Sequence, residues 1–105
     1  MWGLVGSSCE VHYSTAKAGL IGMTKALAKE LGPSGITVNA IAPGVIATEM
    51  NRALGDDVIN QLAEDTPLMR IGEPSEVAKA ALFLASDDAA FITGDVLNVS
   101  GGFVI

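Results

Sequence analysis

Gly35-Ile36-Thr37-Val38-Asn39-Ala40-Ile41-Ala42-Pro43-Gly44, residues 35–44, is the stretch that decides the fold. Its middle, residues 36–42, is rich in β-branched residues and is bounded by glycine on one side and Pro-Gly on the other, which predicts a strand. The preceding residues 13–31 place apolar side chains at steps of three and four, which predicts a helix, and Gly32-Pro33 would stop it. A helix that leads directly into a strand is typical of α/β folds.

The other helices follow from the same kind of pattern. A short helix is predicted over residues 56–64, and a longer one begins at Pro74, a residue favoured at the first helical position. Residues 77–85 of the longer helix are apolar nearly all round, so we expect it to be buried on most sides. Gly19 and Gly22 each cost about 1 kcal/mol in a helix interior and are expected to permit close packing. Three residues of the short helix are expected to face inward: Val58, Ile59 and Leu62.

A second strand is predicted at residues 96–99, after a turn at 93–95. The order helix, strand, helices, strand corresponds to one and a half βα units of a parallel sheet. Two strands are too few for a stable open sheet, so the sequence predicts part of a larger α/β fold. Asn39, inside the first strand, is expected to anchor strand and loop through hydrogen bonds.

Composition excludes several classes of function. The 105 residues carry a formal net charge of −6, which argues against a nucleic-acid partner. No apolar stretch reaches the ~18 residues of a membrane span. A single cysteine, Cys9, rules out an internal disulfide and suits the cytoplasm, and with one histidine it makes a structural zinc site untenable. Half of the residues are hydrophobic and the mean hydropathy is +0.45, so we expect part of the apolar surface to be covered by a partner or a missing segment.

The sequence around Tyr13 indicates acid–base chemistry. Tyr13 and Lys17 are four residues apart in the predicted helix, so they share one face. A nearby cation favours the phenolate, which lowers the pKa of the tyrosine toward the range where general acid–base catalysis works best. The alternative is an ordinary solvated helix face, which the same spacing fits equally well.

The motifs together resemble a known family. Residues 12–28, which include Tyr13 and Lys17, and residues 35–44 resemble the second half of the short-chain dehydrogenases/reductases, and the resemblance runs from Met1 to about Gly102. Within that family the chain is most similar to the 3-oxoacyl-[acyl-carrier-protein] reductases. The resemblance implies a Rossmann-type parallel sheet of which this chain supplies the last two strands with their flanking helices.

The resemblance also implies roles for individual residues. Tyr13 would exchange the proton at the carbonyl or hydroxyl oxygen of the substrate, and Lys17 would lower its pKa and bind the ribose of NADP or NAD. The loop from Pro43 to Thr48 would follow the carboxyl end of a strand, where ligands bind in open parallel sheets. There Gly44 would let the backbone approach the cofactor, while the backbone of Ile46 and the hydroxyl of Thr48 would bind the nicotinamide carboxamide. The alternative is a Pro-Gly turn followed by a helix-capping threonine.

Two features of the family are missing from these residues. The glycine-rich turn that binds the pyrophosphate is absent, and the position of the catalytic serine falls just ahead of Met1. We therefore expect residues 1–105 to be a partial short-chain dehydrogenase/reductase domain, without the N-terminal nucleotide-binding half, and catalytically incomplete alone. A truncated gene product, an internal start and a fragment all fit this expectation.

Two functions remain open at this point. The first is an NAD(P)-dependent oxidoreductase of fatty acid biosynthesis, which reduces a small-molecule or acyl-carrier-bound carbonyl to a hydroxyl through Tyr13 and Lys17. The second is a non-catalytic association module that dimerises through the helix bearing Tyr13 and through the C-terminal strand. Both fit a cytoplasmic homodimer or homotetramer with no nucleic-acid, membrane or metal partner. The residues leave the natural substrate and the choice between NADH and NADPH open.

Overall fold

The computed structural model describes the backbone of residues 2–103 and the side chains of residues 14–103. The chain forms two compact units. The first comprises Met1–Ala40 and Thr93–Asp95, and the second comprises Ile41–Ile92 and Val96–Ile105.

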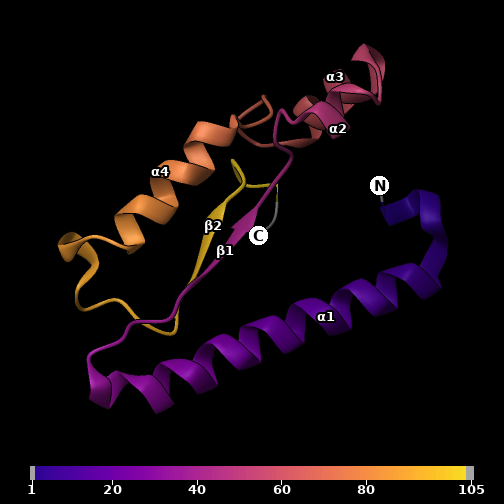
Figure 1. The fold of residues 1–105 in the computed structure, drawn as a ribbon. Helices are drawn as coiled ribbons and strands as arrows, with labels where there is room; N and C mark the ends of the chain where they lie inside the picture. The colour runs from indigo at the N-terminus through magenta and orange to yellow at the C-terminus, as the bar shows by residue number, and fades with distance from the viewer. Residues whose placement is uncertain (1, 104–105) are drawn as a thin grey trace. The chain divides into compact units, whose positions relative to one another are not determined.

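The first unit is dominated by one long helix, α1, which spans Trp2–Leu31 (Figure 1). It ends where the sequence predicted but begins at Trp2 instead of Tyr13; no proline before Pro33 interrupts its hydrogen bonds. A 3₁₀ turn, η1 (Gly32–Ser34), follows and is closed by Gly35, whose φ of 79° is the left-handed conformation that glycine favours. The described residues show no close packing at Gly19 or Gly22, because apart from the neighbouring residues and the helix's own backbone no atom lies within 4 Å of a Cβ built at either position.

The first strand, β1, is shorter than predicted and spans Ala40–Pro43. Residues 36–39 precede it, and they bond to a turn instead of continuing the strand ladder. The N–H of Val38 donates to the hydroxyl of Thr93 (3.0 Å), and its carbonyl accepts from Gly94 (2.7 Å). The side-chain oxygen of Asn39 accepts the N–H of Asp95 (3.1 Å), which confirms its expected anchoring role.

The second strand, β2, spans Val96–Val99, as predicted, and pairs with β1. The N–H of Ala40 donates to the carbonyl of Asp95 (2.9 Å), and the N–H of Gly44 donates to that of Val99 (3.1 Å). Both partners advance by the same step in the same direction, so the strands are parallel. Figure 1 shows them side by side. The predicted α/β class with a parallel sheet is confirmed.

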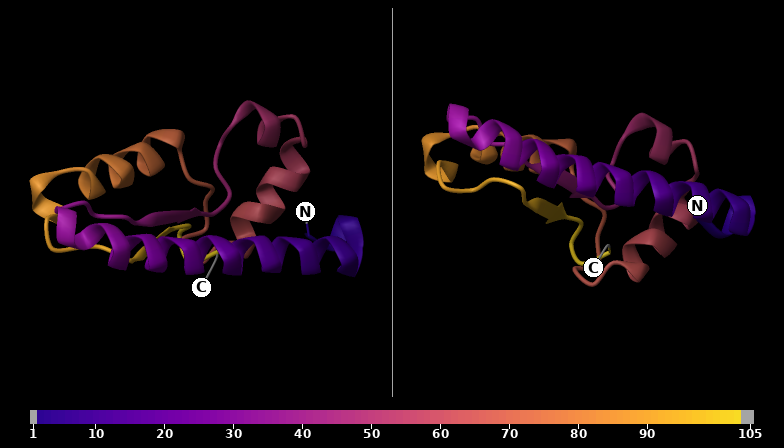
Figure 2. Two further views of the ribbon diagram at one scale, coloured as in Figure 1. Left: turned by 60° about the horizontal axis from the view of Figure 1, so that its bottom comes forward. Right: turned by 90° about the horizontal axis from the view of Figure 1, so that it is seen from below.

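Between the strands the chain passes through α2 (Glu49–Arg52), α3 (Asp56–Asp65), α4 (Pro74–Leu84) and a 3₁₀ turn, η2 (Asp87–Ala89) (Figure 2). The α3 prediction is confirmed for its position, and Ile59 and Leu62 are partly buried as expected, but Val58 is exposed.

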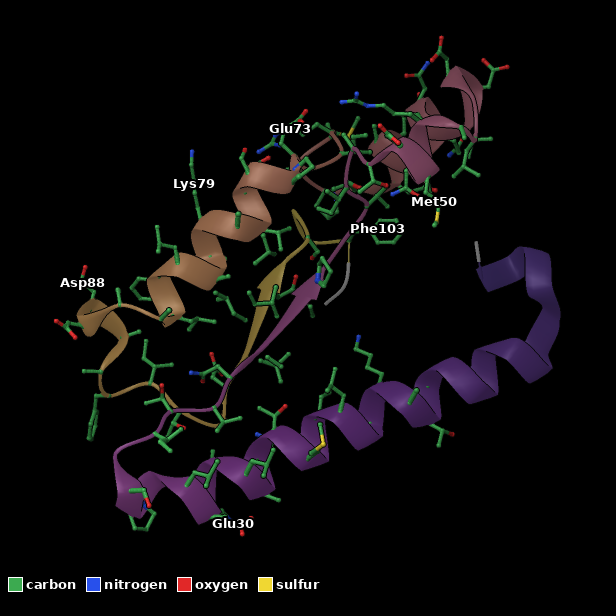
Figure 3. The ribbon with its side chains drawn as sticks, in the orientation of Figure 1. Glu30, Met50, Glu73, Lys79, Asp88 and Phe103 are labelled. Atoms are coloured by element: carbon green, nitrogen blue, oxygen red, sulfur yellow. The ribbon has the colours of Figure 1, made fainter. Side chains whose placement is uncertain are left out.

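The predicted burial of α4 on most sides is wrong. The helix packs against β2 along one face, while Leu82 is 71% exposed and Lys79 points away from the strands (Figure 3). A single two-stranded layer can cover only one face of a helix, which explains the difference. Across the described side chains the buried residues are small: Thr24, Ala28, Ala47, Thr66, Ala89 and Ser100. No helix within residues 2–103 has the length and apolar character that a bilayer span requires.

Candidate functional site

The loop after β1 starts at Gly44, where its backbone passes very close to the backbone of Ser100. Gly44 makes the last ladder bond to β2, and a Cβ at this position would lie 2.8 Å from the Cα of Ser100 and 2.9 Å from its carbonyl oxygen. Such distances are not tolerated, so only glycine fits. The sequence expected Gly44 to permit an approach to a ligand; the approach that the structure shows is to the backbone after β2.

The same loop is held on its other side by Gly72. Ile46 and Gly72 form a parallel bridge, in which Ala47 donates its N–H to the carbonyl of Gly72 and Gly72 donates to that of Val45, both at 2.8 Å. A Cβ at Gly72 would lie 2.9 Å from the Cδ1 of Ile46. Because the bridge uses the peptide groups on either side of Ile46, the N–H and carbonyl of Ile46 itself point away from Gly72.

Thr48 begins α2 as its N-cap. Its hydroxyl oxygen accepts the N–H of Asn51 (3.2 Å), which is the standard capping bond. The capping alternative for Thr48 is therefore correct, but it does not exclude a ligand, because the hydroxyl still has its proton to donate.

Asn51 is a residue that sequence reasoning missed. Its side-chain amide donates to the carbonyl of Ile46 at 2.6 Å, and the N–H of Thr48 donates to the same oxygen at 2.8 Å. The signal for it was available: a threonine followed three residues later by an amide side chain has the spacing of a capping box, in which the later side chain reaches back toward the helix start.

A cavity of about 220 Å³ lies beside this loop. In one part of the cavity wall, the buried Ser100 donates its hydroxyl to the side-chain oxygen of Asn98. The cavity is lined by Val45, Ile46, Leu68, Arg70, Gly72, Glu76, Asn98, Val99, Ser100 and Gly101.

Two charged residues of this wall form an ion pair that the sequence did not predict. The guanidinium of Arg70 donates to both carboxylate oxygens of Glu76, and one of those oxygens also accepts the N–H of Glu73 (3.0 Å). The side-chain bond to Arg70 and the backbone bond from Glu73 lower the pKa of Glu76 to about 2. The same pairing raises the pKa of Arg70. Glu76 is thus an anion throughout the neutral range.

The predicted acid–base pair belongs to α1, in the first unit, whereas the loop belongs to the second. Tyr13 and Lys17 lie one helical turn apart on this helix. The side chain of Tyr13 lies outside the described residues, and Lys17 is partly exposed. Among the described side chains, 14–103, no group of acidic, cysteine or histidine residues could hold a metal ion.

Comparison with known proteins identifies the family. Residues 2–104 match the family model described as Enoyl-(Acyl carrier protein) reductase. The chain belongs to the short-chain dehydrogenase/reductase family.

The curated proteins similar to this short-chain dehydrogenase/reductase include two whose names describe reductases. The chain is 54% identical over 100 residues to the 3-oxoacyl-[acyl-carrier-protein] reductase of Chlamydia trachomatis, covering 95% of this chain and 40% of the relative. It is also 54% identical over 101 residues to an acetoacetyl-CoA reductase of Rhizobium meliloti, covering 95% of this chain and 42% of that protein. The chain therefore spans about 40% of the length of the relatives it matches.

A solved structure agrees with this assignment. The crystal structure of a 3-oxoacyl-[acyl-carrier protein] reductase from Brucella melitensis matches with a TM-score of 0.84 at 45% sequence identity, over 90% of this chain and 35% of that one. The predicted fold, part of a Rossmann-type parallel sheet, is that of a short-chain dehydrogenase/reductase.

Proposed function

We propose that the chain is part of an NAD(P)-dependent oxidoreductase that reduces the 3-oxo group of a 3-oxoacyl thioester to a hydroxyl. The observation that carries the proposal is the placement of Tyr13 and Lys17 one turn apart on α1 in a chain of this family. When bound, NADPH or NADH would supply the hydride and leave as NADP or NAD. Reduction of the carbonyl then needs one proton, which the phenol of Tyr13 donates to the substrate oxygen.

Lys17 makes that proton transfer possible near neutral pH. A cation one turn from the phenol stabilises the phenolate that remains after the proton has left. The chemistry requires the tyrosine to act as an acid in reduction and as a base in the reverse direction, so its pKa must lie close to the working pH. Lys17 also binds the ribose of the cofactor in this proposal.

The second unit supplies a loop with suitable donors. Ligands bind at the carboxyl ends of parallel strands, and the loop from Pro43 to Thr48 follows the end of β1. Gly44 and Gly72 fix the loop from both sides, which pre-orients its peptide groups. The N–H of Ile46 and the hydroxyl of Thr48 are donors that fit the carboxamide oxygen of a nicotinamide, so the residues present fit this part of the cofactor.

The names of the relatives support the substrate class. One relative reduces a 3-oxoacyl group on an acyl carrier protein and another reduces acetoacetyl-CoA, as their names state. Both substrates are thioesters with a carbonyl at the third carbon. We therefore propose the 3-oxoacyl thioester as the substrate, with the carrier left for the experiment to decide.

Spectrophotometric turnover tests the proposal. The polypeptide as its gene encodes it is assayed with acetoacetyl-CoA and with acetoacetyl carrier protein, each with NADPH and NADH. Tyr13→Phe removes the hydroxyl group that would donate the proton, and it is expected to lower kcat by roughly 10²- to 10⁴-fold. Lys17→Met removes the cation beside the phenol and is also expected to lower kcat. Lys25→Met, a lysine substitution on the same helix, is its control and is expected to leave kcat unchanged. Wild-type turnover by Tyr13→Phe would contradict the proposal.

A second candidate is an association module, and a specific observation favours it. Leu20 is 49% exposed and Met23 is 54% exposed on α1. Exposed apolar side chains on one helix indicate an interaction surface. Sedimentation at several concentrations tests it: Leu20→Glu is expected to shift the species toward monomer, whereas Thr15→Glu on the same helix should not. An unchanged oligomer in Leu20→Glu speaks against association through this helix.

A further inference from the structure

The segment from Arg70 to Glu76 is closed on itself by one carboxylate. The guanidinium of Arg70 donates to both carboxylate oxygens of Glu76, at 2.7 and 2.8 Å, and also to the carbonyl of Ile71 at 3.3 Å. The same carboxylate accepts the N–H of Glu73 at 3.0 Å. Residues on both sides of Gly72 are therefore tied to Glu76, and a two-point bond between guanidinium and carboxylate fixes direction as well as distance.

Gly72 lies in the middle of this closed segment and connects it to the loop after β1. Its N–H donates to the carbonyl of Val45 and its carbonyl accepts the N–H of Ala47, both at 2.8 Å. A Cβ on Gly72 would lie 2.9 Å from the Cδ1 of Ile46 and 3.9 Å from a carboxylate oxygen of Glu76. The loop and the carboxylate therefore lie against the same residue.

We propose that Arg70 is a positioning residue: its two bonds to Glu76 fix the conformation of Gly72, and Gly72 in turn orients the peptide groups of residues 45–47. The inference rests on the proposed function, because it takes the loop after β1 to be part of the dinucleotide site. A loop that is oriented before binding loses less conformational entropy when the ligand binds, so its orientation raises affinity. Arg70 takes no part in the proton transfer, which the proposed function gives to Tyr13.

The steady-state constants separate positioning from a merely structural role. The polypeptide as its gene encodes it is assayed with acetoacetyl-CoA at varied NADPH or NADH. Arg70→Met is expected to raise KM for the reduced dinucleotide by roughly threefold to tenfold, the size of one hydrogen bond, and to leave kcat at saturation unchanged. If Arg70 only stabilised the fold, its loss would lower the folded fraction, so kcat would fall while KM stayed the same. That outcome overturns the proposal.

Three further variants test whether Arg70 acts through Glu76. Arg70→Lys keeps the charge but not the planar two-point bond, so its KM should lie between those of wild type and Arg70→Met. Lys79→Met is the matched control: Lys79 is exposed on α4 and lowers the pKa of Glu76 through its charge alone, so its loss should leave KM unchanged. The double variant of Arg70→Met with Glu76→Gln should raise KM no more than the larger single effect, because both changes break one pair. Additive effects overturn the proposal.

A second measurement needs no dinucleotide. Amide hydrogen exchange in Arg70→Met should be faster than in wild type at Gly72 and Ala47, whose N–H groups form the bridge, and unchanged at Gly44, which bonds to β2. Unchanged rates at Gly72 and Ala47 overturn the proposal, and so does faster exchange at all three amides, which indicates global destabilisation. If the wild type neither turns over nor binds a dinucleotide while Gly72 and Ala47 alone accelerate, the proposed function fails and the hold of Arg70 on the loop stands.

Discussion

The guanidinium of Arg70 donates two hydrogen bonds to the carboxylate of Glu76, at 2.7 and 2.8 Å. This pair joins the segment after α3 to the first turn of α4. Glu76 also closes a capping box with Glu73 at the start of that helix. One carboxylate therefore serves as both the ion-pair partner and the helix cap, which couples the wall of the cavity to α4.

The charge of Glu76 predicts a stability that depends on pH. Its pKa is lowered to about 2 in the folded chain, so the ionised form stabilises the fold above the ordinary glutamate pKa of about 4.3, and this contribution is lost as the pH falls from there toward 2. Glu76→Gln keeps an acceptor for the Glu73 N–H but removes the charge. We expect this variant to be less stable than wild type at pH 7 and equal to it near pH 2, by urea unfolding.

Two comparisons control that experiment. Glu64→Gln removes an exposed carboxylate of α3 and should leave the pH dependence unchanged. Because both partners are substantially exposed, salt should reduce the difference between wild type and Glu76→Gln. A difference that persists unaltered at pH 2 would show that the pair does not act through charge.

A side chain at position 44 is expected to destabilise the fold through a steric clash. A methyl group there would lie 2.8 Å from the Cα and Cβ of Ser100, against atoms that cannot rotate away. Gly44→Ala is expected to lower the free energy of unfolding by about 1–3 kcal/mol, the usual cost of overpacking. Gly22→Ala is the contrasting control: it lies within α1 with open space around its Cα, and it should raise stability by about 0.5–1 kcal/mol. Equal effects of the two substitutions would contradict this account.

The turn after β2 predicts a local change in hydrogen exchange. Gly102 has a φ of 91°, and a Cβ on it would lie 2.8 Å from Pro67. The neighbouring Gly101 accepts the N–H of Leu68 (3.1 Å). Gly102→Ala should therefore displace this turn and raise the exchange rate of the Leu68 amide. The amide of Gly35, in the other unit, should keep its rate; acceleration of both amides would indicate global unfolding instead.

Local sequence patterns were enough to predict most helices and strands, but not the length of β1 or the burial of α4. β2 was predictable because the turn at Gly94 precedes a short apolar run, and α3 because Val58, Ile59 and Leu62 recur at helical spacing in a polar segment. The first strand was predicted too long, since residues 36–38 are β-branched, but Val38 and Asn39 bond to the turn at 93–95, a partner that sequence alone does not reveal. The burial of α4 was overestimated because composition shows how apolar a helix is, not how many layers cover it.

The candidate site shows the same division between features that have a local sequence signal and contacts that have none. The strand end at Pro43 and the capping role of Thr48 were predictable because Pro-Gly and a capping threonine are local signals, whereas the cofactor roles of Gly44, Ile46 and Thr48 stay predictions. Asn51 and Arg70 were missed. For Asn51 the spacing from Thr48 did carry a signal, although the carbonyl that its side chain contacts lies five residues away. Arg70 contacts a carboxylate six residues away through side-chain geometry that no periodicity encodes.

Thr48 predicts that capping and ligand binding can be separated. Its hydroxyl oxygen caps α2 by accepting from Asn51, while its proton is the donor that the proposed cofactor site uses. Thr48→Ser retains both capacities and should keep both stability and dinucleotide affinity. Thr48→Asp retains the capping acceptor without a donor, so it should stay as stable as wild type yet bind the dinucleotide more weakly. Thr48→Val loses both and should cost about 1 kcal/mol of stability in addition. Denaturant unfolding and calorimetric binding on the three variants measure the two effects separately, and wild-type affinity in Thr48→Asp would remove the hydroxyl from the site.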